Sequence, residues 1–392
     1  TTIGGLTLAS GPARIGDDPT MAMDPAPGFF GLTADYFSHA SEDAYWQDRT
    51  LQPSRLTVPI LADTGFYDPE ARGPYEAFKL TRHLGSHLLL MGAHDGFPAG
   101  TGGPFPQYRR WFERYLLGVD NGIDREPAVQ AWIGKGSRQK LLAGEVVRLE
   151  GEDWPLPGTR WRPMYLSNVR SGTAKSLNDG TLSLAPAPVS VKQVYSSATS
   201  NPLGSDPQTT SVPANTGAGG YTLGGVLDRF PSSTEMNQLE PQSLTYTSAP
   251  LGAPMDSIGP ASLHARLAST SPETDIHAVV ADVWPDGTAH PVAVGRLRTS
   301  YPRTIASRSV VDPVSGETVQ PYADFSAKTF ATPGVARDYD VEIWPIGNRF
   351  GAGHRIRLYL TGTSGYMVPA APSVNTVTVG GPARSRLVLP SR

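Results

Sequence analysis

The sequence predicts a short parallel α/β unit followed by a large all-β sandwich. Residues 56–118 alternate between apolar, strand-like runs and helix-like segments, which is typical of a parallel sheet. After about residue 125 the chain breaks into short alternating runs separated by Gly, Pro, Asn or Asp, which favours a sandwich or jelly roll. The composition agrees, because 42 Gly, 37 Pro and 18% charged residues suit turn-rich β structure.

Length, charge and cysteine content limit the possible functions. A chain of 392 residues can form about two or three domains. The net charge of −3 gives no broad basic surface, so we expect no nucleic-acid partner. No apolar run reaches ~18 residues, so we expect no membrane span. The absence of cysteine excludes disulfides, zinc–thiolate sites and a Cys nucleophile.

The α/β unit is predicted from four segments in order. LTVPILADTGF (56–66) is a β-branched apolar run suited to a buried strand. A helix is expected to follow, with Pro69 and Glu70 in its first turn and Gly85 at its end. SHLLLMGA (86–93) is the second buried strand. The earlier segment SEDAYWQDRT predicts a short helix with Ser41 as N-cap.

The fourth segment is the clearest helix of the chain. Its large apolar residues recur at helical spacing, and Gly118 is a plausible stop: Tyr108, Trp111, Phe112, Tyr115 and Leu116. We expect Trp111, Phe112 and Tyr115 to belong to the core and not to a pocket. Further along, residues 195–225 are rich in Ser, Thr, Pro and Gly and predict a long surface loop.

The sandwich is predicted from short runs after residue 125. They are EPAVQAWIG, WRPMYLS, QSLTYTSAPL, ASLHARLAST, IHAVVADVWP, AHPVAVGRLRTSY, RDYDVEIWPIG, HRIRLYLTGT, NTVTVGG and SRLVLPS. No fixed-period repeat indicates a propeller or a solenoid.

Two titratable residues stand at the carboxyl ends of the two predicted parallel strands. Asp68 follows the first strand, and His94 follows the second, 26 residues later. In open α/β sheets, ligands bind beyond these strand ends. A carboxylate followed by an imidazole is also the order of the last two members of a Ser–Asp–His triad. We therefore expect Asp68 to orient His94, and we expect His94 to act as general base.

These residues carry a resemblance to a known family. VPILADTGFYD, AHDG, YRRWFERYLLGVDNGI and EPAVQAWIG resemble the C-terminal part of the cocaine-esterase-like family, which is related to Xaa-Pro dipeptidyl-peptidases and α-amino acid ester hydrolases. The family pattern Gly-Trp-Tyr-Asp is matched by Gly65-Phe66-Tyr67-Asp68, and Gly-x-x-His by a tighter Gly92-Ala93-His94. The resemblance extends from about residue 40 to the end of the chain.

The resemblance implies the C-terminal portion of an α/β-hydrolase, with a cap remnant, followed by an all-β jelly-roll sandwich. The implied domains are a cap remnant at 1–50, the α/β-hydrolase portion at 51–130 and the jelly roll at 131–392. Phe66 and Tyr67 are expected either to line the substrate pocket or to pack beneath the site. The family's Gly-x-Ser-x-Gly elbow is not found. Its look-alike GTSGY at 362–366 has the wrong order, so the resemblance implies a nucleophile on an N-terminal Ser-bearing segment or chain.

Some titratable residues near the two strand ends have other possible roles. Asp68 could instead cap the helix that follows it. Asp63 is a rival acid, but its place inside an apolar run indicates a buried hydrogen-bonding role. His83 and His87 are expected to be structural, and Asp95 a solvated turn residue.

Two more chemistries are disfavoured. Thr1 could serve as an N-terminal nucleophile, but the expected fold does not support that chemistry. DVWPDG and PETDIH lack the spacing of a calcium loop, so no metal and no cofactor are expected.

The function expected from the sequence is hydrolysis of a small ester, amide or peptide through an acyl-enzyme. Xaa-Pro dipeptidyl-peptidase activity in the same family is one alternative, and a non-catalytic β-sandwich binding module is another. The chain opens TTIGGLTLAS, without a signal-peptide pattern, and we expect the start of a fragment or processed chain. An extracellular location is favoured, with a cytoplasmic one as alternative, and a homo-oligomer is possible.

Overall fold

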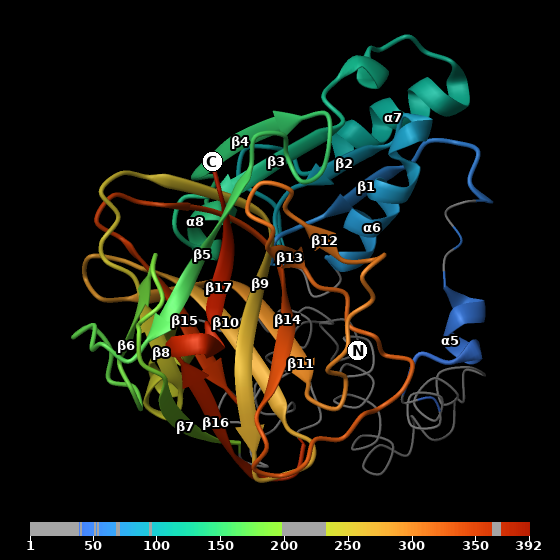
Figure 1. Cartoon of the computed structure of the whole chain (residues 1–392). Coiled ribbons are helices and arrows are strands. Elements are labelled where there is room, and N and C mark those ends of the chain that lie inside the picture. The colour runs from blue at the N-terminus through green and yellow to red at the C-terminus, as the bar shows by residue number, and fades with distance from the viewer. Residues whose placement is uncertain are drawn as a thin grey trace, which may run out of the picture.

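The computed structural model describes residues 39, 41–50, 52, 55–67, 71–93, 96–197, 233–362 and 370–392. Within them, three parallel strands and two helices, here called the α/β layer, lie beside a mostly-β sandwich (Figure 1). No helix of the described ranges is long and apolar enough to cross a membrane.

A short helix, α5 (Ala44–Arg49), opens the described chain. Its N-cap is Asp43, whose carboxylate accepts a hydrogen bond from Tyr45 N at 3.0 Å. The prediction of Ser41 as N-cap is therefore wrong. The Ser41 hydroxyl lies 3.2 Å from the Tyr301 hydroxyl instead, so this residue ties the segment before α5 to the sandwich.

The α/β layer contains β1 (Leu61–Thr64), β2 (His87–Leu90) and β3 (Val129–Gly134), which are parallel and adjacent in that order. Helix α6 (Arg72–Thr81) continues into the 3₁₀ turn η2 (Arg82–Leu84). Helix α7 (Phe105–Leu117) precedes the 3₁₀ turn η3 (Ile123–Arg125). The strand–helix–strand–helix order predicted for residues 56–118 is confirmed.

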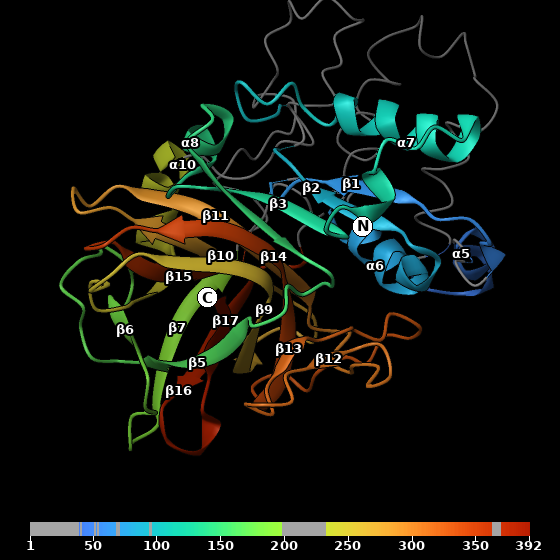
Figure 2. The ribbon, with the colours of Figure 1, turned by 90° about the horizontal axis from the view of Figure 1, so that it is seen from above.

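The two helices cover opposite faces of these strands, as Figure 2 shows. On one face, Phe78 of α6 is buried in the same cluster as Leu88 and Leu90 of β2. On the other face, Trp111 of α7 lies 5.2 Å from the His87 ring, centroid to centroid. Alternate side chains of a strand point to opposite faces, so the continuous apolar runs of β1 and β2 follow from burial on both sides.

Helix α7 differs in part from its prediction. It ends at Gly118, whose φ of +72° suits glycine, as expected. Trp111 is buried, but Phe112 is 58% exposed and Tyr115 is 39% exposed. The expectation that Phe112 and Tyr115 belong to the core is therefore wrong for this chain. The spacing identified an apolar face but not what covers it.

The remaining strands form the sandwich and its margins. They are β4 (Val146–Gly151), β5 (Arg160–Ser167), β6 (Gly180–Ser183), β7 (Val191–Ser197), β8 (Leu244–Thr247), β9 (Met255–Ser269), β10 (Asp275–Val283), β11 (Ala289–Arg298), β12 (Val310–Val311), β13 (Thr318–Gln320), β14 (Arg337–Phe350), β15 (Arg355–Thr361), β16 (Ser373–Val379) and β17 (Arg386–Ser391). Short helices at the margins are α8 (Arg138–Leu142), α10 (Ser233–Leu239), η4 (Glu240–Gln242) and η5 (Gly381–Ala383).

The sandwich closes on itself. The hydrogen-bonded order runs β14-β11-β10-β15-β8-β6-β5-β17-β9, and β9 pairs in turn with β14. Its core holds fully buried residues from facing strands: Leu263, Val280, Val341, Leu358 and Leu387. Burial of one such side chain contributes about 1.5–3 kcal/mol. All of the strand-like runs expected between residues 242 and 391 contain a strand. The expected β sandwich is confirmed, but as mostly β and not all β, because α8 and α10 lie among its strands.

One strand joins the α/β layer to the sandwich. β3 pairs in parallel with β14 through Gly134 and Asn348, so a single sheet runs through both parts. The domain boundary expected between residues 130 and 131 falls inside β3 and stays a prediction. Of the loop expected at 195–225, the first three residues belong to β7, and the rest lies outside the described residues.

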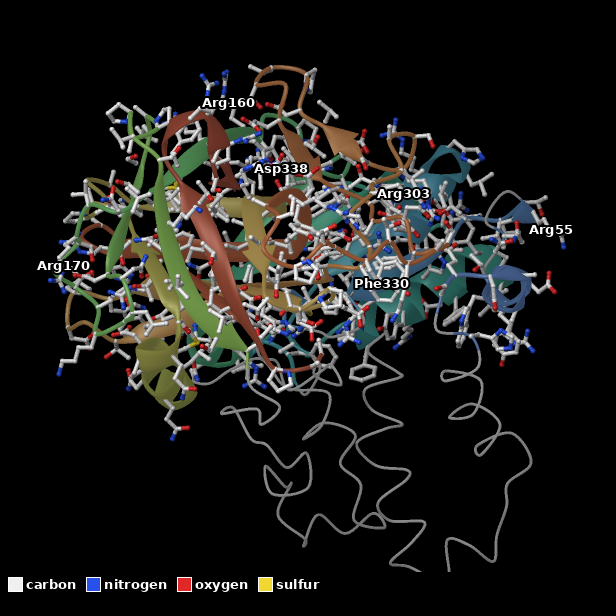
Figure 3. All side chains as sticks on the ribbon, turned by 60° about the horizontal axis from the view of Figure 1, so that its bottom comes forward. Arg55, Arg160, Arg170, Arg303, Phe330 and Asp338 are labelled. Atoms are coloured by element: carbon white, nitrogen blue, oxygen red, sulfur yellow. The ribbon has the colours of Figure 1, made fainter. Side chains whose placement is uncertain are left out.

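Charged side chains are spread over the outside of the molecule. Figure 3 shows Arg55, Arg160 and Arg170 at separate places on the surface. Arg303 and Asp338 lie outward as well (Figure 3), with exposed side chains. Phe330 is a large apolar residue that is exposed in the same way.

Candidate active site at the ends of β1 and β2

The backbones that leave β1 and β2 touch each other. A Cβ atom placed on Gly65 would lie 2.3 Å from Gly92 O and 3.1 Å from Ala93 Cα. The contact of 2.3 Å with Gly92 O is shorter than real Cβ atoms make, so only glycine at position 65 permits this approach. Gly92 itself has a φ of +97°, which also favours glycine. The two glycines of the family-like motifs therefore allow the two strand ends to meet.

The pairing continues beyond the strands. Tyr67 forms a parallel bridge with Ala93, one residue before Asp68 and one residue before His94. Ala93 and Gly96 exchange two backbone hydrogen bonds, of 2.9 and 3.2 Å. Asp68 and His94 themselves lie outside the described residues. Their pairing stays a prediction, which the bridge between their neighbours supports.

Phe66 and Tyr67 are buried. Phe66 is 3% exposed and Tyr67 is 1% exposed, and both belong to the core cluster of the α/β layer. Burial raises the pKa of the Tyr67 hydroxyl well above its ordinary value, and the Asp282 carboxylate raises it further, while Arg138 lowers it. Tyr67 is therefore neutral at pH 7. This burial favours packing beneath the site, and the role of both residues in substrate binding stays a prediction.

Asp63 has the hydrogen-bonding role expected of it. Its Oδ2 accepts a hydrogen bond from the Tyr108 hydroxyl of α7. Burial and this hydrogen bond raise the pKa of Tyr108. Asp63 thereby anchors α7 on β1, on the face of the sheet that also carries His87.

His87 and His83 differ in their surroundings. His87 is buried against Trp111, and burial lowers its pKa although Glu126 opposes the shift. A neutral, buried His87 fits the structural role expected. His83 is exposed, in η2. Asp95, Thr1 and residues 363–366 of GTSGY lie outside the described residues.

A second Ser–His–Asp arrangement, which the sequence analysis missed, lies in the sandwich. Ser262 and His264 are two residues apart on β9 and so share a face, and Asp340 of β14 is opposite His264 in register. Ser262 Oγ lies 3.2 Å from His264 Nε2, and His264 Nδ1 hydrogen-bonds to Asp340. This is the connectivity of a catalytic triad.

The surroundings of this arrangement argue against catalysis. Ser262 is fully buried, and its hydroxyl donates to the carbonyl of Thr318, on β13, at 2.7 Å. His264 Nε2 lies 3.2 Å from the same carbonyl. A nucleophile must reach a substrate carbonyl, which β13 prevents here. These residues hold β13 on β9. The motif Ser-x-His was visible in the sequence, but its acid lies 76 residues further along.

Metal ligands do not gather in the described part of the chain. Among those residues, no group of three or more His, Cys, Asp or Glu side chains is arranged to hold an ion.

Comparisons with known proteins identify relatives. Residues 121–386 match the family described as the X-Pro dipeptidyl-peptidase C-terminal non-catalytic domain. A cocaine esterase from Rhodococcus sp. (strain MB1 Bresler) is 25% identical over 297 residues, which is 70% of this chain and 47% of the relative. The match to the family begins after α7, so β1 and β2 precede it.

Solved structures show the same fold. A CocE/NonD family hydrolase from Staphylococcus aureus superposes with a TM-score of 0.68 at 15% identity, over 92% of this chain and 59% of that one. An aminopeptidase from Thaumarchaeota archaeon also gives a TM-score of 0.68, at 17% identity, over 97% of this chain and 63% of that one. This chain spans less than two thirds of each relative. Its relatives are hydrolases, and it carries the domain described as non-catalytic.

Proposed function

This chain belongs to the X-Pro dipeptidyl-peptidase C-terminal domain family, within the CocE/NonD-like hydrolases, and we propose that it completes a serine hydrolase of ester or amide bonds. Asp68 is the acid of the proposed triad and His94 the base. The nucleophilic serine and the oxyanion hole come from an N-terminal segment or chain outside the 392 residues. The observation that carries the proposal is the bridge between Tyr67 and Ala93, which brings the residues just before Asp68 and His94 side by side.

The proposed mechanism has two halves. His94 takes the proton of the serine hydroxyl while the serine oxygen attacks the substrate carbonyl. His94 then gives that proton to the departing alcohol or amine. His94 then takes a proton from a water molecule as that water attacks the acyl carbon, and it returns the proton to the serine oxygen as the acid is released. Asp68 holds the imidazole in one tautomer and stabilises its charged form.

The architecture proposed is the C-terminal portion of an α/β-hydrolase domain followed by a jelly roll. Residues 1–50 would be the cap remnant, 51–130 the hydrolase portion and 131–392 the jelly roll. In its support, β1 ends the strand order and pairs only with β2 among the described strands, which leaves an edge for a further strand. Phe105, Phe112 and Leu116 of α7 are exposed, as expected of a helix that another part of the protein covers.

The substrate class proposed is a small ester, amide or peptide. The relatives include a cocaine esterase and an aminopeptidase, so both ester and peptide cleavage have a precedent in this fold. Xaa-Pro dipeptidyl-peptidase activity would also need a carboxylate that holds the free amine of the substrate, and we expect such a group in the cap or in the N-terminal part of the enzyme. A binding module is the second candidate, because the matched domain is described as non-catalytic.

Labelling with a fluorophosphonate tests the proposal, because this probe reacts with activated serines. The purified protein is treated with the probe and separated on a denaturing gel beside an intact-mass spectrum. We expect the label on a polypeptide other than this 41.8 kDa chain, or on a longer chain that contains it. A label on this chain would contradict the proposal. The Ser262→Ala variant then shows whether the buried arrangement on β9 had reacted.

Without any label, and with this chain as the sole species, the binding-module candidate is favoured.

A further inference from the structure

Strand β14 of the sandwich contacts the chain on both sides of Asp68. Phe66 packs on Gly347, and Arg72 pairs with Glu342. Both partners belong to β14, which lies outside the α/β layer. The segment 66–72, here called the acid segment, is therefore attached at each end to one strand of the domain described as non-catalytic.

The Phe66 contact depends on a glycine. A Cβ atom on Gly347 would lie 2.2 Å from Phe66 Cδ2 and 2.3 Å from Cε2. The ring of Phe66 thus occupies the space that any side chain at position 347 would need. Gly347 pairs with Ile258 of β9, which is fully buried in the same cluster as Phe66. Because cores are close-packed, the ring cannot turn aside on its own and would move together with its backbone.

The Arg72 contact is ionic and reinforced. Arg72 Nε donates to Glu342 Oε1 at 3.2 Å, and its guanidinium lies 4.2 Å from the centre of the Tyr322 ring. Gln320 Nε2 donates to Glu342 at 3.0 Å and to Glu76 of α6 at 3.1 Å. The N-terminal half of α6 is therefore bound to β14 and β13, at a partly buried site where such pairs are weakly screened.

A third contact fixes the neighbouring strand. Asn348, next to Gly347, accepts a hydrogen bond from Gly136 N at 3.0 Å. Its amide donates to Asp282 Oδ2, also at 3.0 Å, and Asp282 bonds to His354 Nδ1 at 2.7 Å. Gly136 follows β3, so β14 holds the strand beside β2 in register. A fully bonded buried network of this kind is rigid.

We propose that Gly347 and Glu342 are positioning residues for the acid of the triad. The sandwich would then contribute to catalysis without contacting substrate. Gly347 determines how closely the Phe66 ring packs on β14, and Glu342 holds the N-terminus of α6. Together, these two contacts would determine the position of the Asp68 carboxylate relative to the His94 ring. This inference rests on the proposed function. A positioning role differs from a merely structural one in its effect on His94. Substitutions in β14 should change the pKa of His94 even in variants that stay folded.

The test is a titration of His94 by NMR in the 392-residue chain, with histidine labelled at ¹³Cε1 and the His94 signal assigned from His94→Gln. Asp68→Asn first establishes the proposed pair. Loss of the carboxylate should move the His94 midpoint down by about 1 pH unit. Gly347→Ala is expected to move it in the same direction by a smaller amount, because the Cβ atom displaces Phe66 and with it Asp68. Glu342→Gln is expected to do likewise.

Matched controls distinguish displacement of Asp68 from a general loss of stability. Gly252→Ala is the same substitution in open space, with no atom within 4 Å of the new Cβ, and should leave the midpoint unchanged. Phe66→Leu combined with Gly347→Ala removes the clash and should restore the midpoint in part. Urea unfolding identifies variants that fold. If Gly347→Ala does not fold, Glu342→Gln carries the test alone.

Two results would overturn the inference, and they are distinguishable. If Asp68→Asn moves the midpoint but folded Gly347→Ala and Glu342→Gln do not, the pair exists and β14 does not position it. If Asp68→Asn itself has no effect, the proposed pair of Asp68 and His94 fails, and the inference fails with it. In enzyme assembled with its serine, Gly347→Ala is expected to lower kcat about 10-fold with KM unchanged.

Discussion

Gly65→Ala is the substitution that most directly disturbs the meeting of β1 and β2. The new Cβ atom would lie 2.3 Å from Gly92 O, 2.7 Å from Gly92 C and 3.1 Å from Ala93 Cα. All three are backbone atoms, so no side chain can rotate away. Restoring ordinary contact requires the two backbones to separate by about 1 Å, and overpacking of this size typically costs about 1–3 kcal/mol.

If Asp68 and His94 pair as proposed, the same separation would move the Asp68 carboxylate away from the His94 ring. A displacement of about 1 Å at a catalytic group can lower the rate on the order of 100-fold. We therefore expect Gly65→Ala to lower the free energy of unfolding in urea and, in assembled enzyme, to slow fluorophosphonate labelling far more than its loss of stability explains.

Gly73→Ala is the matched control. This glycine lies in α6 with no atom within 4 Å of an added Cβ. Alanine is favoured over glycine in a helix by up to about 1 kcal/mol, but Pro74 follows and disfavours a helical residue with a Cβ atom before it, so the two effects oppose each other. The control should unfold close to the wild type and be equally reactive. If Gly65→Ala unfolds at the same urea concentration as the wild type, the close approach of the two strand ends is wrong.

Three further predictions address other parts of the chain. Trp111→Ala should destabilise the protein by about 3–5 kcal/mol, because the buried Trp111 packs on His87. Urea unfolding should show a change below about 0.5 kcal/mol for Leu116→Ala, whose side chain is 74% exposed. Ser262→Ala should leave hydrolysis unchanged and cost about 1 kcal/mol, because its hydroxyl only bonds to Thr318 O; loss of hydrolysis in a folded variant would assign it a catalytic role. Burial raises the pKa of Asp282 from 3.8 to about 6, although the hydrogen bonds of Asn348 and His354 oppose the shift. Because the folded state then holds a proton that the unfolded state releases, the free energy of unfolding should fall by up to about 3 kcal/mol as the pH rises from about 4 to 6. Asp282→Asn should lack this loss in urea titrations at several pH values, and a pH profile identical to that of the wild type would refute the prediction.

Local pattern predicted the elements well. The continuous apolar runs of β1 and β2, and the helical spacing around Trp111, identify structure from a few neighbouring residues. The N-cap of α5 was missed by two residues, because Ser41 and Asp43 are both good caps. Only the hydrogen bond from Tyr45 N to Asp43 distinguishes them.

Contacts between distant residues could not be predicted in the same way. The pairing of Gly134 with Asn348 and the packing of Phe66 on Gly347 join segments more than 200 residues apart. A strand pattern gives the faces of a strand but not its partner or register. For the same reason, a Ser-x-His motif on β9 did not reveal Asp340. The exposed side chains of α7 show a further limit of prediction from sequence. The helical spacing of apolar residues predicts an apolar face, but it does not tell whether another part of this chain buries that face.

His94 is proposed to activate a serine with the help of Asp68. The most direct measurement is the rate at which a fluorophosphonate labels that serine in assembled enzyme, compared among wild type, His94→Gln and His83→Gln. Removal of a triad base is expected to slow labelling on the order of 1,000-fold or more, whereas His83 is exposed in η2 and its substitution should have no effect. Equal labelling rates for wild type and folded His94→Gln would contradict the proposed role of His94 as the base.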